Sequence, residues 1–305
     1  MNLLEVQGVT KAYASKVAVD NVSFVLGRGT VFGLLGPNGA GKTSLIRMIT
    51  RITFPDAGTI FFEGETLSEK HQGKIGYMPE ERGLYRKMKV SEQIIYLLRL
   101  KGIAQKQAAE LCDYWLERFE LGKWKNNKVQ ELSKGMQQKV QFIATIAHEP
   151  PLLILDEPFS GLDPINAQLI EDVIREFSQK AISVIFSTHR MEQVEEFCNR
   201  ILLINDGRVL VDEDIRVLRN QFRKNIFTVE LAEPISEDFQ LPPEVTLLEK
   251  QNYLFKASLP PHLDSRYLLY HLAQKFSIVR FEQYTPSLRE IFIEFVNSSK
   301  ATNSN

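Results

Sequence analysis

The sequence contains little cysteine and almost no net charge. Its two cysteines, Cys112 and Cys198, lie far apart and have no metal-ligand spacing. They give no sign of a disulfide framework, and they fit a reducing cytosol better. The formal charge is −1 at pH 7. Because nucleic-acid-binding proteins carry a strong basic field, we expect no nucleic-acid partner.

Long hydrophobic runs are also missing. No window approaches the roughly 18 uninterrupted apolar residues that a membrane-spanning helix needs. The opening residues, MNLLEVQGVTKAY, lack the basic and then apolar regions of a signal peptide. We therefore expect a soluble chain, for which any action at a membrane requires another protein to supply the span. The length of 305 residues allows one large or two modest domains.

Apolar runs alternate with helical patterns over most of the chain. Short strands are predicted at 3–9, 18–26, 31–35, 60–62 and 74–78. Helices follow to about residue 120, and Ser91 is the predicted N-cap of the first. Bare apolar runs at 152–155 and 182–187, separated by a helical stretch at 165–177, predict parallel strands buried on both faces. We expect an α/β domain over 1–220, interrupted by a helical part at about 85–148.

The last part of the chain has a different pattern. Strands are predicted at 226–231, 246–248, 253–257 and 278–282, with a helix at 267–274. In PSLREIFIEFV, one apolar stripe at helical spacing consists of Leu288, Ile291, Phe292 and Phe295. We expect a small α+β domain over 226–297 and a flexible tail over 298–305.

A glycine-rich loop follows the run at 31–35 and precedes a helical stretch. Residues 36–43, GPNGAGKT, match the phosphate-binding pattern GxxxxGK[ST]. The glycines let backbone N–H groups surround phosphate oxygens, Lys42 supplies a charge for the β- and γ-phosphates, and the Thr43 hydroxyl can ligate Mg²⁺. The predicted nucleotide-binding residues are Gly36, Pro37, Asn38, Gly39, Ala40, Gly41, Lys42, Thr43 and Ser44.

Two adjacent acids end the apolar run in PPLLILDEP. Asp156 and Glu157 are costly at the end of a buried strand unless they face an ion or water. On the functional interpretation, Asp156 holds Mg²⁺ through water and Glu157 polarises the attacking water. On the structural alternative, the pair merely caps the next helix.

The segment LSKGM, residues 132–136, is too polar for a core and yet opens a helix. Val140, Ile143, Ala144 and Ala147 follow it at helical spacing. The start contains a glycine and looks uncapped, which is unusual for a helix. The structural alternative is an ordinary surface helix start.

These motifs, in this order and with the helical insert between them, resemble the ATP-binding subunit of a bacterial ABC transporter. The resemblance covers about residues 2–220. It implies a P-loop NTPase core of the ABC ATPase type, with an antiparallel β subdomain and a helical subdomain, that binds ATP and Mg²⁺. It also implies that LSKGM, in place of the usual LSGGQ, grips the γ-phosphate held by a second subunit.

The resemblance assigns further residues. It implies that Tyr13 stacks on adenine, that SGLD ending at Asp163 is the D-loop, and that His189 contacts the γ-phosphate as a catalytic histidine beside Glu157 and Lys42. Within LSKGM, Ser133 and Gly135 match the family pattern and are implied ATP-binding residues. Lys134 and Met136 depart from the pattern but leave the backbone donors in place.

GYMPEERGLY contains another departure. The family usually has glutamine after the proline, whereas this chain has Glu80. A carboxylate can bind Mg²⁺ but cannot donate a hydrogen bond when ionised. We predict that Glu80 is a metal-site residue with Thr43 and Asp156. The alternative is that Glu80 and Glu81 are solvated loop charges.

The resemblance implies an ATPase that powers transport, peripheral on the cytoplasmic face of the membrane. Its partners would be a separately encoded permease, docked on the helical segment after GYMPEERGLY, and a second ATPase subunit in a homodimer or heterodimer. The ending TPSLREIFIEFV resembles the C-terminal domain of sodium- and drug-exporter ATPases, which favours export. Alternatives are an importer ATPase or a soluble ABC ATPase acting on ribosomes or nucleic acid. A non-hydrolysing regulatory subunit is disfavoured because Lys42, Asp156, Glu157 and His189 are all present.

Overall fold

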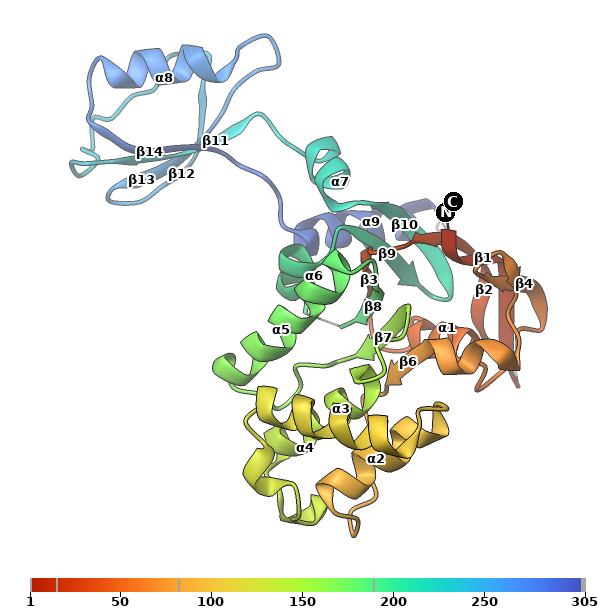
Figure 1. The fold of residues 1–305 in the computed structure, drawn as a ribbon. Coiled ribbons are helices and arrows are strands. Elements are labelled where there is room, and N and C mark those ends of the chain that lie inside the picture. The colour runs from red at the N-terminus through yellow and green to blue at the C-terminus, as the bar shows by residue number, and fades with distance from the viewer. Residues whose placement is uncertain (1, 15, 82, 189, 303–305) are drawn as a thin grey trace. The chain divides into compact units, whose positions relative to one another are not determined.

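The computed structural model describes residues 2–14, 16–81, 83–188 and 190–302 and contains two compact units (Figure 1). The first unit is Met1–Ile215 and the second is Arg216–Asn305. The transition comes slightly before the position at which the sequence pattern changes. In the described part of the chain, no helix is long and apolar enough to cross a membrane.

A six-stranded sheet forms the centre of the first unit. Its order is β10 (Arg208–Asp214), β9 (Arg200–Asn205), β3 (Val31–Leu35), β8 (Ser183–Ser187), β7 (Leu152–Asp156) and β6 (Ile75–Met78). Neighbours pair in parallel except β9 and β10. All residues of β3, β7 and β8 are buried, so the predicted parallel strands covered on both faces are confirmed.

The hairpin of β9 and β10 was absent from the sequence prediction. Its turn contains Asp206 at φ 48° and Gly207 at φ 78°. Two successive positive φ angles characterise the tight turn of a hairpin, and Asp-Gly is its usual sequence. The sequence therefore contained a signal for this hairpin, the Asp206-Gly207 pair.

An antiparallel sheet packs over the first helix. Its order is β2 (Lys16–Gly27), β1 (Asn2–Tyr13), β4 (Ala57–Phe62) and β5 (Glu65–Thr66). Helix α1 (Lys42–Ile49) buries Leu45, Ile46, Met48 and Ile49 in one hydrophobic core with residues of both sheets. Phe24 of β2 and Phe32 of β3 stack with ring centroids 5.3 Å apart. The helix that follows the phosphate loop is thus fixed by both sheets.

The helical part contains α2 (Val90–Leu100), α3 (Gln105–Arg118) and α4 (Lys134–Ile146) (Figure 1). The predicted N-cap at Ser91 is wrong, because Ser91 lies inside α2 and is buried. The N–H groups of Val90 and Ser91 instead donate to the carbonyls of Asn127 and Lys125. A distant segment of chain therefore replaces the expected cap.

Contacts between side chains join the helical part to α5 (Pro164–Gln179), which precedes β8. The Trp115 and Phe177 rings meet edge to face with centroids 6.0 Å apart. Beside them, the Arg118 guanidinium donates to the Glu176 carboxylate at 2.6 Å. A second helix, α6 (Met191–Phe197), lies between β8 and β9 in the sequence.

The second unit contains an antiparallel sheet in the order β12 (Thr246–Lys250), β13 (Leu254–Ser258), β11 (Ile226–Leu231) and β14 (Ile278–Gln283). Helix α8 (Ser265–Ala273) covers one face and buries Leu268 and Leu272 against it (Figure 1). The Asp264 carboxylate caps α8 by accepting from the Arg266 and Tyr267 N–H groups. The expected strand and helix mixture is present in this unit.

Helix α7 (Ile215–Gln221) begins at the last residue of the first unit, and the second unit contains the rest of it and α9 (Leu288–Thr302). Phe222 and Phe295 contact each other with ring centroids 5.2 Å apart, and Leu288 and Ile291 are buried. Helix α9 continues to Thr302, so residues 298–302 of the predicted flexible tail are helical. Residues 303–305 lie outside the described part.

Candidate functional site

The phosphate loop connects the buried end of β3 to the first turn of α1. A side chain at Gly36 would place its Cβ 2.2 Å from the Ile204 carbonyl oxygen, and one at Gly41 would come equally close to that of Ala18. Both glycines also have positive φ, 151° and 110°. Only glycine satisfies the space and the backbone conformation at these two positions.

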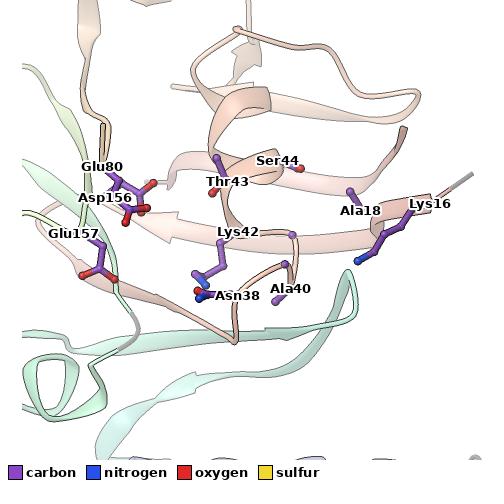
Figure 2. Close-up of a pocket in the computed structure, with 12 residues that line it drawn as sticks. Lys16, Ala18, Asn38, Ala40, Lys42, Thr43, Ser44, Glu80, Asp156 and Glu157 are labelled. Atoms are coloured by element: carbon purple, nitrogen blue, oxygen red, sulfur yellow. The ribbon is translucent and has the colours of Figure 1, made fainter. Parts of the chain in front are cut away.

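A cavity of about 450 Å³ opens beside this loop (Figure 2). Its lining comprises Lys16, Ala18, Asn38, Gly39, Ala40, Gly41, Lys42, Thr43, Ser44, Glu80, Asp156 and Glu157. We call it the phosphate-loop cavity. The structure therefore brings together most of the predicted loop residues and three of the four predicted acids, Glu80, Asp156 and Glu157.

Lys42 lies between the loop and the acids (Figure 2). Its ammonium donates to the Gly36 and Pro37 carbonyls at 2.7 and 3.1 Å. Burial lowers its pKa, and the neighbouring Asp156 and Glu157 oppose that change. The cation is thus held in place by the loop itself and is available to an anion entering the cavity.

The acids come from neighbouring strand ends. Asp156 ends β7 and is buried, which raises the pKa of its carboxyl, and the charges of Glu80 and Glu157 raise it further. Three carboxylates on one side of a cavity repel each other, so a bound cation would stabilise them. Among described residues, no group of three acids, histidines or cysteines could hold a metal on its own.

Glu157 is held in an uncommon conformation. Its φ is 49°, in the left-handed region that non-glycine residues seldom adopt. Its N–H donates to the Ser187 carbonyl at 2.9 Å, and its carboxylate accepts from the Thr188 hydroxyl at 3.1 Å. These contacts from the end of β8 direct the carboxylate into the cavity.

The hairpin of β1 and β2 contributes the other end of the cavity. Tyr13 is 40 % exposed and pairs directly with Lys16 across the turn. The Lys11 ammonium lies 5.7 Å from the Tyr13 ring centroid and is itself held by Asp56 at 2.6 Å. Tyr13 does not line the phosphate-loop cavity, whereas Lys16 does and extends toward the loop (Figure 2).

Lys16 was not identified from the sequence. It belongs to no motif, but its position opposite Tyr13 in a short hairpin was a usable signal. It makes no ion pair with any residue that the structure describes, so its charge is not already neutralised there.

The start of α4 is capped, and the sequence prediction of an uncapped start is wrong. The Ser133 hydroxyl accepts the Met136 N–H at 3.2 Å. Helix geometry gives the N–H groups of Lys134 and Gly135 no acceptor within α4. Ser133 and Gly135 do not line the phosphate-loop cavity of their own chain.

Asp163 acts as the N-cap of α5. Its carboxylate accepts from the Asn166 backbone at 2.9 Å and side chain at 2.5 Å, which lowers its pKa. It does not line the phosphate-loop cavity. His189, which the family resemblance places at the γ-phosphate, lies outside the described residues.

A glycine loop with a lysine at the end of a parallel strand, faced by two acids at the end of β7 in the same sheet, defines a nucleotide-binding ATPase of the phosphate-loop class. Comparison with known proteins identifies the family within this class. Residues 19–160 match the family model of ABC transporters, and residues 214–296 match that of the ATP-binding protein DrrA1-3-like C-terminal domain.

Two relatives and one solved structure illustrate the similarity. The uncharacterized ABC transporter ATP-binding protein YhaQ of Bacillus subtilis is 40% identical over 297 residues, which cover 97% of this chain and 99% of YhaQ. The Nod factor export ATP-binding protein I of Burkholderia thailandensis is 35% identical over 218 residues, 70% of this chain and 72% of that protein. A solved ATP binding subunit of an ABC transporter superposes with a TM-score of 0.68 at 30% identity, covering 72% of this chain and 93% of that one.

The chain therefore belongs to the ABC transporter ATP-binding proteins. It is an ATPase subunit that binds ATP and powers a transporter, and it has a DrrA-like C-terminal domain.

Replacing Lys16 by alanine should weaken ATP and ADP binding alike, by about two- to fivefold, because one exposed cation is removed from the cavity. The loss should shrink at high salt, since salt screens exposed charges. Isothermal titration at two salt concentrations measures the loss of affinity and its dependence on salt. Lys106→Ala, on the exposed side of α3, is the matched control. Equal affinities of wild type and Lys16→Ala at low salt would contradict the assignment.

Proposed function

We propose that this chain hydrolyses ATP for an exporter whose membrane-spanning part is a separate polypeptide, and that it acts as a dimer at the cytoplasmic face of the membrane. The observation that carries this proposal is the phosphate-loop cavity, in which Lys42 faces Asp156 and Glu157. The relative named for Nod factor export and the DrrA-like C-terminal domain support the export direction.

Within the cavity, the oxygen donors suit Mg²⁺, which prefers hydroxyl, carboxylate and phosphate oxygens and keeps several waters. Thr43 and Asp156 would hold it, with Glu80 as an additional carboxylate ligand. When bound, Mg²⁺ would neutralise charge developing on the phosphates. Because Mg²⁺ takes only one or two protein carboxylates, no cluster of three acids is required. Glu157 would orient the attacking water.

Dimerisation would complete the site. The first N–H groups of α4 carry the positive end of the helix dipole, and Ser133 leaves those of Lys134 and Gly135 open. We propose that they bind the γ-phosphate held by a second copy or a related subunit. Tyr13 would stack on adenine, and Asp163 and His189 would act at the subunit junction. ATP can drive closure only if the closed dimer binds ATP more tightly than the open dimer does.

A second cavity, of about 310 Å³, suits the membrane partner. It lies between the 79–84 loop, α2 and α4, and we call it the α2–α4 cavity. Its apolar wall includes Leu84, Leu97, Leu100 and Ala144, and Tyr85 and Tyr96 are exposed nearby. We propose that a short helix of the permease docks here, because an apolar hollow with exposed tyrosines next to its lining residues Leu84 and Leu97 fits an amphipathic helix.

Glu157→Gln should keep ATP binding but reduce turnover at least about a hundredfold, because the amide accepts no proton and orients water poorly. Phosphate release and nucleotide titration separate the two effects. Retained hydrolysis would refute the assignment of Glu157.

Glu80→Ala should raise the Mg²⁺ concentration for half-maximal ATP binding by about tenfold, because a carboxylate ligand is lost. Glu81→Ala, at the next exposed position, is the matched control and should behave as wild type. An unchanged Mg²⁺ dependence, together with unchanged coupling to a permease, would show that Glu80 is only a solvated loop charge.

The transporter assignment is tested by tagging the chain in its native host and identifying what co-purifies from gently solubilised membranes. We expect a polytopic membrane protein at near-equal stoichiometry, and its relatives would then decide the transport direction. Recovery only in the soluble fraction, with ribosomal or repair proteins, would favour the soluble ATPase alternative.

A further inference from the structure

One buried side chain connects the wall of the α2–α4 cavity to the segment that enters the phosphate-loop cavity. Gln141, on α4, is 5% exposed and lines the α2–α4 cavity. Its Nε2 donates to the Pro79 carbonyl at 2.8 Å. The amide orientation is unambiguous, because a carbonyl oxygen can only accept. Gln141 is therefore tied to the segment that enters the phosphate-loop cavity at the next residue, Glu80.

The bond acts on a rigid unit. The Pro79 carbonyl belongs to the peptide plane that joins Pro79 to Glu80, and this plane does not twist. Fixing the carbonyl fixes the direction in which the chain leaves Pro79, and so the position from which the Glu80 side chain begins. Pro79 lines one cavity and Glu80 lines the other.

The other end of the amide is not satisfied. Gln141 Oε1 is buried and accepts no hydrogen bond from the part of the chain that the structure describes. An unpaired buried acceptor costs stability, so stability alone does not explain a glutamine at this position. Gln141 and Pro79 both line the α2–α4 cavity, which shares no lining residue with the phosphate-loop cavity.

We propose that Gln141 is a positioning residue that holds the Pro79–Glu80 peptide and thereby connects the α2–α4 cavity to the acids of the ATP site. The inference deepens the proposed function, since it rests on Glu80 acting at the metal and on the permease occupying the α2–α4 cavity. It adds a residue that belongs to neither the phosphate loop nor the LSKGM segment.

The test replaces Gln141 by methionine, which has a similar length and volume but offers no donor. Hydrogen exchange of the 79–85 segment should become about two- to tenfold faster, which corresponds to the loss of one hydrogen bond. Thr145→Val is the matched control, because Thr145 lines the same cavity and bonds only the main-chain carbonyl of Gln141. Unchanged exchange in Gln141→Met would overturn the proposal.

A second readout separates positioning from mere structural support. Gln141→Met should raise the Mg²⁺ concentration for half-maximal ATP binding several-fold in the wild-type background and have no further effect in Glu80→Ala. Two results would refute the role of Gln141 but leave that of Glu80 intact. One is full additivity of the two substitutions. The other is that Glu80→Ala shifts the Mg²⁺ dependence, whereas Gln141→Met speeds hydrogen exchange and leaves the Mg²⁺ dependence unchanged. If Glu80→Ala causes no shift, the metal role in the proposed function fails, and hydrogen exchange still decides whether Gln141 holds the segment.

Discussion

The backbone clamp around the phosphate loop is the constraint on which the rest of the site depends. The Gly207 N–H donates to the Ala40 carbonyl at 2.9 Å, and the Gly207 carbonyl accepts from the Asp20 N–H at 2.8 Å. The loop is thus held between β2 and the turn of β9 and β10, with carbonyls so close at Gly36 and Gly41 that no side chain fits. Because these contacts hold the loop, they also set the position of Lys42 and α1, against which the acids are arranged.

The acids are positioned by the same six-stranded sheet that positions the phosphate loop. Parallel strands end at one edge of a sheet, so the ends of β6, β7 and β8 bring Glu80, Glu157 and Thr188 toward the loop that follows β3. Burial raises the pKa of Asp156, and Lys42 partly offsets that rise. The negative side of the cavity is therefore under electrostatic strain that a phosphate-bound cation would relieve.

The sequence was informative where the cause of a structure is local. The phosphate loop, the acid pair and the parallel strands depend on residues close together in the chain, and they were predicted. Two errors had local causes that were overlooked, the Asp206-Gly207 turn of β9 and β10 and the Ser133 cap of α4. The others depended on the folded arrangement. Ser91 is not a cap because residues 125–127 accept the N–H groups of α2, and Lys16 joins the site only through hairpin geometry. Tyr13, Ser133, Gly135, Asp163 and His189 rest on family resemblance and stay predictions.

Helix α4 binds the backbone beside two of the acids through two glutamine side chains. Gln138 and Gln141 are three residues apart and so lie on one face. Gln138 donates to the Pro158 carbonyl at 3.0 Å, next to Glu157, as Gln141 does to Pro79, next to Glu80. Helix α4, whose start we propose to bind the nucleotide of a second subunit, thus holds the backbone beside both acids of its own site. A displacement of α4 would therefore move the backbone beside Glu80 and Glu157 together, which would couple the proposed dimer closure to both acids.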